Sequence, residues 1–261
     1  NEYSGISVSI NSDGTIVAIG ARGNDEVYTN AGTTRIYEWN DNDWVLKGNQ
    51  INGLTEEEYS GNSVSINSDG TIVAIGANFN GEAYTNVGTT RIYGWNGSDW
   101  VLKGNEINAL TDLEQSGQSV SINSDGTIVA IGARSNGEAH TNAGTTRIYE
   151  WNGSDWTLLF NQINGLTEGE FSGTSVSINS NGTSVAIGAP NSNSNTGCLR
   201  VYSLSDSTSA PSSSGNLYVT GDISLNSRLY IQNTDILTYI QSLETRIQTL
   251  EGVGATGTIV S

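Results

Sequence analysis

The sequence predicts an all-β fold, a β-propeller of four-stranded antiparallel blades followed by short β-strands and a short coiled-coil helix. The main observation is a 56-residue repeat, present four times, whose phrase Ser-Gly-x-Ser-Val-Ser-Ile-Asn-Ser-(Asp/Asn)-Gly-Thr begins at Ser4, Ser60, Ser116 and Ser172. Such long periods are typical of propellers and related repeat folds. The composition agrees, because the chain has 32 Gly, only 2 Pro, and many β-branched and aromatic residues. We therefore assign residues 1–204 to a propeller-like domain of four repeats.

The first half of each repeat predicts two strands joined by a tight turn. In the first copy, residues 6–10 alternate apolar and small polar side chains, which is the pattern of a half-buried strand. Asp13 and Gly14 follow, and an Asp-Gly pair tolerates the positive φ of a hairpin turn. Residues 15–21 are a nearly continuous apolar run, so we expect a strand that is covered on both faces.

The second half of each repeat predicts two more strands. A polar loop over residues 22–32 leads to the β-branched and aromatic residues 33–39, and a turn at 40–42 precedes a fourth strand at 43–47. A single meander of this kind cannot cover both of its faces, so we expect the copies to stack around a common centre. The copies either close a ring alone or belong to a larger ring that further repeats or another chain complete.

The ends of the repeat domain differ from its middle. Residues 1–5 match the inter-repeat segment 57–61, which predicts a processed or partial product whose repeats continue upstream. The fourth copy lacks both tryptophans of the other copies and has no evident fourth strand, so we expect a terminal unit. Trp39, Trp44 and their copies serve either as sugar-stacking platforms or in packing between blades. Their recurrence in every full copy favours packing.

Two phrases give the repeats a family resemblance. The stretches Ser-Gly-x-Ser-Val-Ser-Ile-Asn-Ser-Asp-Gly-Thr-Ile-Val-Ala-Ile-Gly-Ala and Thr-Arg-Ile-Tyr-Glu-Trp-Asn-Gly-Ser-Asp-Trp resemble the FG-GAP-like repeats of extracellular β-propellers, distant relatives of the integrin α head. The resemblance covers residues 3 to about 203 and implies adhesive or structural surface roles by analogy. One departure is that the Phe-Gly of that family is Ser-Gly in all four copies.

The remaining residues predict a stalk. Residues 205–215 are Ser-rich without apolar periodicity, which predicts a linker, and residues 216–233 predict a short β stalk. Residues 234–251 predict a coiled-coil oligomerisation helix, and 252–261 a tail. The helix is predicted because apolar side chains recur at alternating steps of 4 and 3, at Ile236, Ile240, Leu243, Ile247 and Leu250. The alternative is an amphipathic helix packed on the head.

The stalk indicates a homo-oligomer. Two heptads are too short to hold chains together alone, so the neighbouring strands must contribute. Ile at position a with Leu at position d leans towards two chains. However, the phrase Gly-Asp-Ile-Ser-Leu-Asn-Ser-Arg-Leu-Tyr-Ile resembles repeats in fibre-like structural proteins of large algal viruses and some phages. This resemblance implies a trimer, which we favour over a dimer.

Charge and hydropathy exclude several partners. With 10 Lys and Arg against 27 Asp and Glu, the net charge of −17 would repel nucleic acid and anionic membranes. No stretch approaches the roughly 18 apolar residues that a membrane span needs. The single cysteine, Cys198, excludes an internal disulfide framework.

Candidate chemistry is sparse, and we expect neither an enzyme nor a cofactor. Asp13, Asp69 and Asp125 are candidates for calcium because integrin-type repeats carry oxygen ligands in such loops, but an Asp-Gly hairpin turn explains them better. The acidic run at residues 56–58 imitates a glycosidase pair, yet a charge run between repeats is usually a solvated loop.

Loops that differ between copies are where a unique ligand would be recognised. The candidates are Arg22, Asn24, Asp25, Phe79, Arg134 and His140. His140 is the only histidine, and no cysteine or serine motif accompanies it, so we expect an ordinary loop position.

These features predict a structural or adhesive fibre or appendage protein at an extracellular or virion surface. Its head would contact a surface protein, and its stalk would gather several chains. The alternatives are a lectin-like head that binds a glycan receptor and, less favoured, a carbohydrate-active hydrolase.

Overall fold

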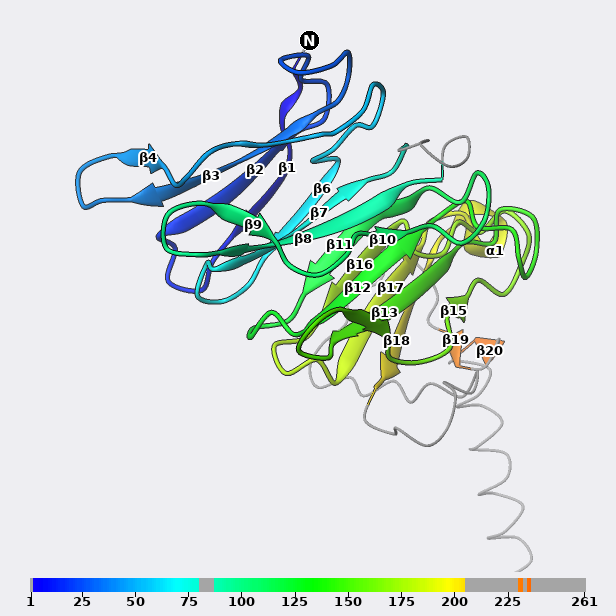
Figure 1. The fold of residues 1–261 in the computed structure, drawn as a ribbon. Coiled ribbons are helices and arrows are strands. Elements are labelled where there is room, and N and C mark those ends of the chain that lie inside the picture. The colour runs from blue at the N-terminus through cyan, green and yellow to red at the C-terminus, as the bar shows by residue number, and fades with distance from the viewer. Residues whose placement is uncertain (1, 80–86, 205–229, 232–233, 236–261) are drawn as a thin grey trace, which may run out of the picture.

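A computed structural model describes residues 2–79, 87–204, 230–231 and 234–235. Nearly every element is a β-strand, and the strands of residues 4–203 form four antiparallel sheets that lie side by side in an arc (Figure 1). The predicted all-β class and the repeated antiparallel blades are therefore confirmed. We number the blades 1 to 4 in chain order.

The first three blades have the same strands in the same order. Blade 1 consists of β1 (Ser4–Ile10), β2 (Ile16–Ala21), β3 (Thr33–Trp39), β4 (Trp44–Leu46) and β5 (Ile51–Asn52). Blade 2 consists of β6 (Ser63–Ile66), β7 (Ile72–Ala77), β8 (Thr89–Trp95), β9 (Trp100–Leu102) and β10 (Ile107–Asn108). Blade 3 consists of β11 (Ser116–Ile122), β12 (Ile128–Ala133), β13 (Thr145–Trp151), β14 (Trp156–Leu158) and β15 (Ile163–Asn164).

The predicted fourth strand of each full blade is divided in two. In blade 1 both β4 and β5 pair with β3, so the sheet follows the meander β1-β2-β3 and ends in a broken outer strand. The break contains Gly48, whose φ of 73° is left-handed and whose missing side chain leaves room for the ring of Trp95. The sequence prediction placed one strand here and missed the second piece.

Blade 4 is smaller, as the sequence predicts. It contains β16 (Ser175–Ile178), β17 (Ser184–Ala189) and β18 (Cys198–Ser203), with the one-turn helix α1 (Ser192–Asn195) between the last two strands. Beyond it, β19 (Tyr230–Ile231) and β20 (Thr234–Asp235) form a separate two-stranded sheet. β20 occupies the first two residues of the predicted coiled-coil helix. The rest of that helix and the linker lie outside the described residues.

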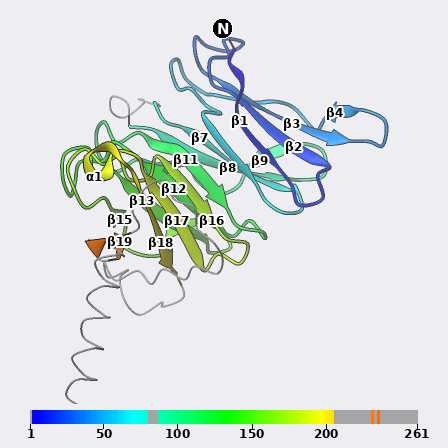
Figure 2. The same cartoon turned by 180° about the vertical axis from the view of Figure 1, so that it is seen from behind.

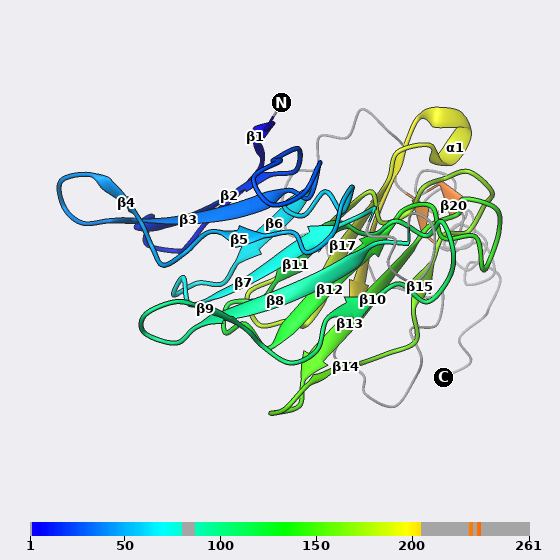
Figure 3. The same ribbon diagram turned by 45° about the horizontal axis from the view of Figure 1, so that its top comes forward.

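The apolar core lies between neighbouring blades. Each full blade has a forward face, towards the next blade, and a rear face, towards the preceding one. Ile16, Ala18 and Ile36 on the forward face of blade 1 pack against the rear face of blade 2, and the same arrangement recurs between blades 2 and 3. The rear face of blade 2 contributes Val64, Ile66, Val73, Ile75 and Trp100. Figure 3 shows the blades stacked in this order.

The inner strands β1, β6, β11 and β16 lie next to one another around the centre of the arc, which Figure 2 shows from behind. The arc is open at blade 1. Val8 and Ile10 on its rear face are 64% and 58% exposed, whereas their counterparts Val64 and Ile66 are 8% and 7% exposed. Blades 1, 2 and 3 cover the rear faces of blades 2, 3 and 4, respectively. Nothing in the described part of the chain covers the rear face of blade 1 in this way.

Candidate functional site

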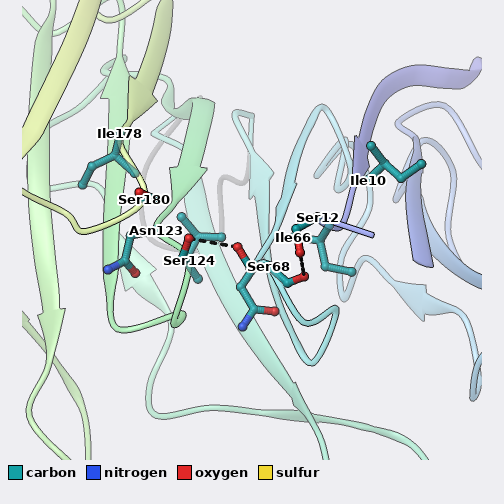
Figure 4. A pocket seen from close by; sticks show the side chains of 10 residues that line it. Ile10, Ser12, Ile66, Ser68, Asn123, Ser124, Ile178 and Ser180 are labelled. Carbon is teal, nitrogen blue, oxygen red and sulfur yellow. Dashed lines mark hydrogen bonds between the residues drawn. The ribbon is translucent and has the colours of Figure 1, made fainter. Parts of the chain in front are cut away.

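A cavity of 240 Å³ lies where the inner strands turn into the second strands (Figure 4). One serine from each of the four blades lines it, and these serines are joined in a row by backbone hydrogen bonds. The backbone N–H of Ser12 donates to the carbonyl of Ser68 at 3.1 Å, that of Ser68 to Ser124 at 3.1 Å, and that of Ser124 to Ser180 at 3.0 Å. Isoleucines from each inner strand and two buried asparagines, Asn67 and Asn123, complete the lining.

The chemistry of this cavity is neutral and repetitive. Three of its hydroxyl groups already have partners in neighbouring blades, since Ser12 Oγ donates to the Ser68 carbonyl and Ser68 Oγ to Ser124 Oγ, both at 2.9 Å. Every lining residue recurs at the 56-residue spacing, so each blade contributes nearly the same groups. We therefore assign the cavity to the packing of the blades.

The predicted calcium candidates lie in the turns beside this cavity. Asp13 Oδ1 accepts hydrogen bonds from the backbone N–H and the hydroxyl of Thr15, and these bonds lower the pKa of Asp13. Asp69 and Asp125 make the same contacts. No group of three or more acidic, histidine or cysteine side chains that could hold a metal ion occurs in the described ranges. The turn explains the aspartates, and calcium binding stays a prediction.

The opposite end of the blades, which we call the loop end, brings together residues that differ between copies. Arg22 lies over the ring of Tyr3 at 5.9 Å, and Phe79 meets the ring of Tyr59 edge-on at 5.4 Å. In blade 3, Arg134 donates from Nε to Gln115 Oε1 at 2.8 Å. Arg134 also lies over the ring of Phe171 at 5.7 Å. These seven residues form what we call the loop-end row.

The backbone at the start of each repeat explains part of this row. Tyr3, Tyr59, Gln115 and Phe171 occupy equivalent positions 56 residues apart, and their φ angles are 52°, 56°, 55° and 54°. Non-glycine residues rarely adopt this left-handed conformation, and it occurs preferentially where a side chain is placed for function. The conformation recurs in all four copies while the side chain varies.

The arginines of the loop-end row differ electrostatically from the other arginines of the blades. Arg35, Arg91, Arg147 and Arg200 pair with Glu2, Glu58, Glu114 and Glu170, respectively. Arg22 and Arg134 instead bond to the neutral amides of Asn62 and Gln115. Their positive charge is therefore available to an acidic group of a partner.

The acidic run at residues 56–58 is not a solvated loop throughout. The Glu58 side chain is 0% exposed, bonds to Arg91, and accepts from the backbone N–H of Leu54 at 2.6 Å. Burial, the largest single cause, would lower the pKa of Arg91, but the neighbouring Glu58 and Glu106 carboxylates together raise it above its ordinary value. This carboxylate ties the connecting segment to the next blade, which explains its burial as a structural contact.

The other loop candidates have different environments. Asn24 is buried, and its Oδ1 accepts from the backbone N–H of Glu26 at 3.0 Å, so its side chain shapes the loop from inside. Asp25 is exposed and accepts from the Asn30 N–H at 2.6 Å. His140 is exposed at the surface of its loop.

The tryptophans pack between blades, as their recurrence predicts. Trp100 is 7% exposed and donates from Nε1 to the Lys47 carbonyl of blade 1 at 2.8 Å. Trp156 makes the same bond to Lys103. No blade among the described residues packs against Trp44 of blade 1, and its side chain is 39% exposed.

Sequence reasoning found Arg22, Phe79 and Arg134 from their variation between copies. It missed their partners Tyr3, Tyr59, Gln115 and Phe171. The signal was present, because the residue before each invariant Ser-Gly varies between copies: it is Tyr in the first two, Gln in the third and Phe in the fourth.

The fold and its interfaces define a propeller-like repeat protein. Comparison with protein families and with curated proteins finds no match, so the resemblance to FG-GAP-like and fibre proteins rests on the sequence phrases alone. Among solved structures, the chain is similar to hydrazine synthase of Kuenenia stuttgartiensis, with 9% identity and a TM-score of 0.51 over 79% of this chain and 48% of that one. It is also similar to a putative 6-phosphogluconolactonase from Bacteroides uniformis, with 11% identity and a TM-score of 0.51 over 76% of this chain and 49% of that one.

These similarities show the fold alone, because the identities are far below the level at which function transfers. The chain spans about half the length of each of these two proteins. No helix among the described residues has the length and apolar character to cross a membrane.

Proposed function

We propose that this chain is a non-catalytic structural or adhesive surface protein whose head contacts a receptor through the loop-end row. The observation that carries the proposal is the contrast between the two ends of the blades. The cavity end repeats the same serines, isoleucines and turn residues from blade to blade, whereas the loop end presents aromatic rings and the charge of Arg22 and Arg134 at positions that vary. A constant scaffold with individual loops is the usual arrangement of a binding surface.

The proposed receptor is a surface protein with acidic groups, because the half-buried guanidinium groups of Arg22 and Arg134 have no carboxylate among their bonded partners, and guanidinium groups select carboxylates. A glycan receptor is the second candidate. It is favoured by the guanidinium and aromatic pairs, since rings that lie beside hydrogen-bonding groups also suit sugars.

The test is binding of the labelled full chain to a panel of intact cells and to a glycan array. Arg134→Ala should weaken saturable binding, and Ser124→Ala in the cavity is the matched control that should leave it unchanged. Protease treatment of the cells removes a protein receptor, whereas periodate removes a glycan. Binding that ignores Arg134→Ala but falls with Ser124→Ala would move the site to the cavity and contradict the proposal.

The stalk part of the proposal is that residues 216–251 gather chains into a homotrimer, so that weak heads gain avidity in a fibre at an extracellular or virion surface. Sedimentation equilibrium of residues 1–261 against residues 1–204 tests it. We expect a mass of three chains for the first and one chain for the second. Monomers in both cases would remove oligomerisation from the proposed function.

A further inference from the structure

The interfaces between blades are built from one set of polar contacts. Ser7 Oγ on the forward face of blade 1 donates to the Gly61 carbonyl at 2.8 Å, and Ser9 Oγ accepts from the Ile66 N–H at 3.0 Å. At the outer edge, the backbone N–H of Asn49 donates to Asp99 Oδ1 at 2.9 Å. The equivalent serines make the same bonds at the next two interfaces, and Asn105 repeats the outer bond to Asp155.

Shape complements these bonds. Gly70 on the rear side of blade 2 has no space for a side chain, because Ile16 of blade 1 packs directly against it. Gly126 and Gly182 receive Ile72 and Ile128 in the same way. A forward face is therefore recognised by an isoleucine, two serine hydroxyls and the broken outer strand.

The rear face of blade 1 retains these receiving groups, and no blade in the part of the chain that the structure describes covers it. Val8 and Ile10 are exposed, and Trp44 is 39% exposed where Trp100 is 7% exposed. Gly14, the counterpart of Gly70, has nothing near the position of a side chain. Asp43 corresponds to Asp99, but where Asp99 accepts from Asn49, the bond found for Asp43 within the described ranges comes from its own neighbour, the Trp44 N–H.

The free forward face of a second copy does not match this surface. Blade 4 keeps the two serines, as Ser175 and Ser177, but Ser184 replaces the isoleucine of the other forward faces. Blade 4 also has three strands in the described residues, and these three strands include no counterpart of the outer strand that carries Lys47 and Asn49. The forward faces of blades 1 to 3 are already covered within the chain.

We infer that the rear face of blade 1 is a docking surface for one further blade of the full 56-residue type. The partner is defined chemically: a four-stranded blade with an isoleucine at the position of Ile16, paired serine hydroxyls, and an outer strand that presents a backbone carbonyl to Trp44 and an asparagine to Asp43. This inference is independent of receptor binding at the loop end.

The test supplies that blade and measures whether Val8 becomes covered. A second copy of residues 1–56 is fused ahead of Asn1, which keeps the 56-residue register, and Val8→Cys is introduced only in the original blade 1. Thiol labelling of Cys at this position should slow by about tenfold or more in the fusion relative to the full chain alone. The native Cys198 gives little background, since it is buried and burial raises the pKa of its thiol.

Two controls make the result decisive. Val64→Cys in the fusion should label slowly throughout, which reports that the blades are folded. Ile16→Ser in the added blade copies Ser184 and should protect position 8 less. The inference is overturned if the intact added blade does not slow labelling, or if its Ile16→Ser form protects equally well. It is also overturned if the unfused chain protects position 8 with rising protein concentration, because a second copy would then be the occupant.

Discussion

Loss of the buried Glu114 carboxylate should destabilise the protein far more than loss of the equivalent Glu2. Glu114 is 0% exposed, and it pairs with Arg147, accepts from Asn136 Nδ2 at 2.9 Å, and accepts from Thr111 Oγ1 at 2.9 Å. Glu114→Ala leaves the buried Arg147 charge without its partner, which costs about 3–5 kcal/mol. Glu2 occupies the same position of the repeat but is 41% exposed, so Glu2→Ala should cost about 1 kcal/mol or less.

The assay is urea unfolding followed by tryptophan fluorescence, which reports the free energy of unfolding of each variant. The double variant Glu114→Leu with Arg147→Met should recover much of the loss, because it removes both charges and keeps apolar volume. Equal losses for Glu114→Ala and Glu2→Ala would refute the reasoning, since burial would then not determine the value of the pair.

Three further outcomes follow from the contacts between blades. Trp100→Phe should lower the free energy of unfolding by about 1 kcal/mol through loss of its hydrogen bond, whereas Trp44→Phe should change it little, as urea unfolding can show. Bonds from the Asn49 backbone and side chain lower the pKa of Asp99, so its contribution to stability is present above its ordinary pKa of about 3.9 and is lost as the pH falls through the folded-state pKa. The stability difference between the native chain and Asp99→Asn should therefore be largest at neutral pH and shrink below about pH 4 in the same assay. In residues 1–204, Ser184→Ile should bring the forward face of blade 4 closer to those of blades 1 to 3 and produce concentration-dependent association in sedimentation, and a monomer at all concentrations would count against the proposed role of this isoleucine in blade recognition.

The repeat made most of the fold predictable. Alternation at residues 6–10 and the apolar run at 15–21 locate β1 and β2 within two residues at each end, because hairpins between neighbouring segments depend on local pattern. The break between β4 and β5 was not predicted, because it depends on how Gly48 fits against Trp95 of the next blade.

The role of Glu58 shows a different limit. Read along the chain, it is one of three consecutive acids and predicts a solvated loop. In the structure it is buried, because Arg91 lies opposite it 33 residues later. The repeat contains a signal for this contact, because a glutamate precedes an arginine by 33 residues in each of the first three copies, at Glu2 and Arg35, Glu58 and Arg91, and Glu114 and Arg147. In the fourth copy, Glu170 precedes Arg200 by 30 residues.

The serine bonds and glycine contacts that recur at all three interfaces between blades have a genetic consequence. An unequal recombination that removes residues 61–116 would join Ser60 to Gly117 in the correct register, and blade 1 would then meet the old blade 3 through contacts that both already possess. Insertion of one whole repeat would preserve the contacts between neighbouring blades for the same reason. The number of repeats can therefore change by whole units without any compensating substitution. Blade 4 is the exception, because Ser184 replaces the isoleucine that the other forward faces carry.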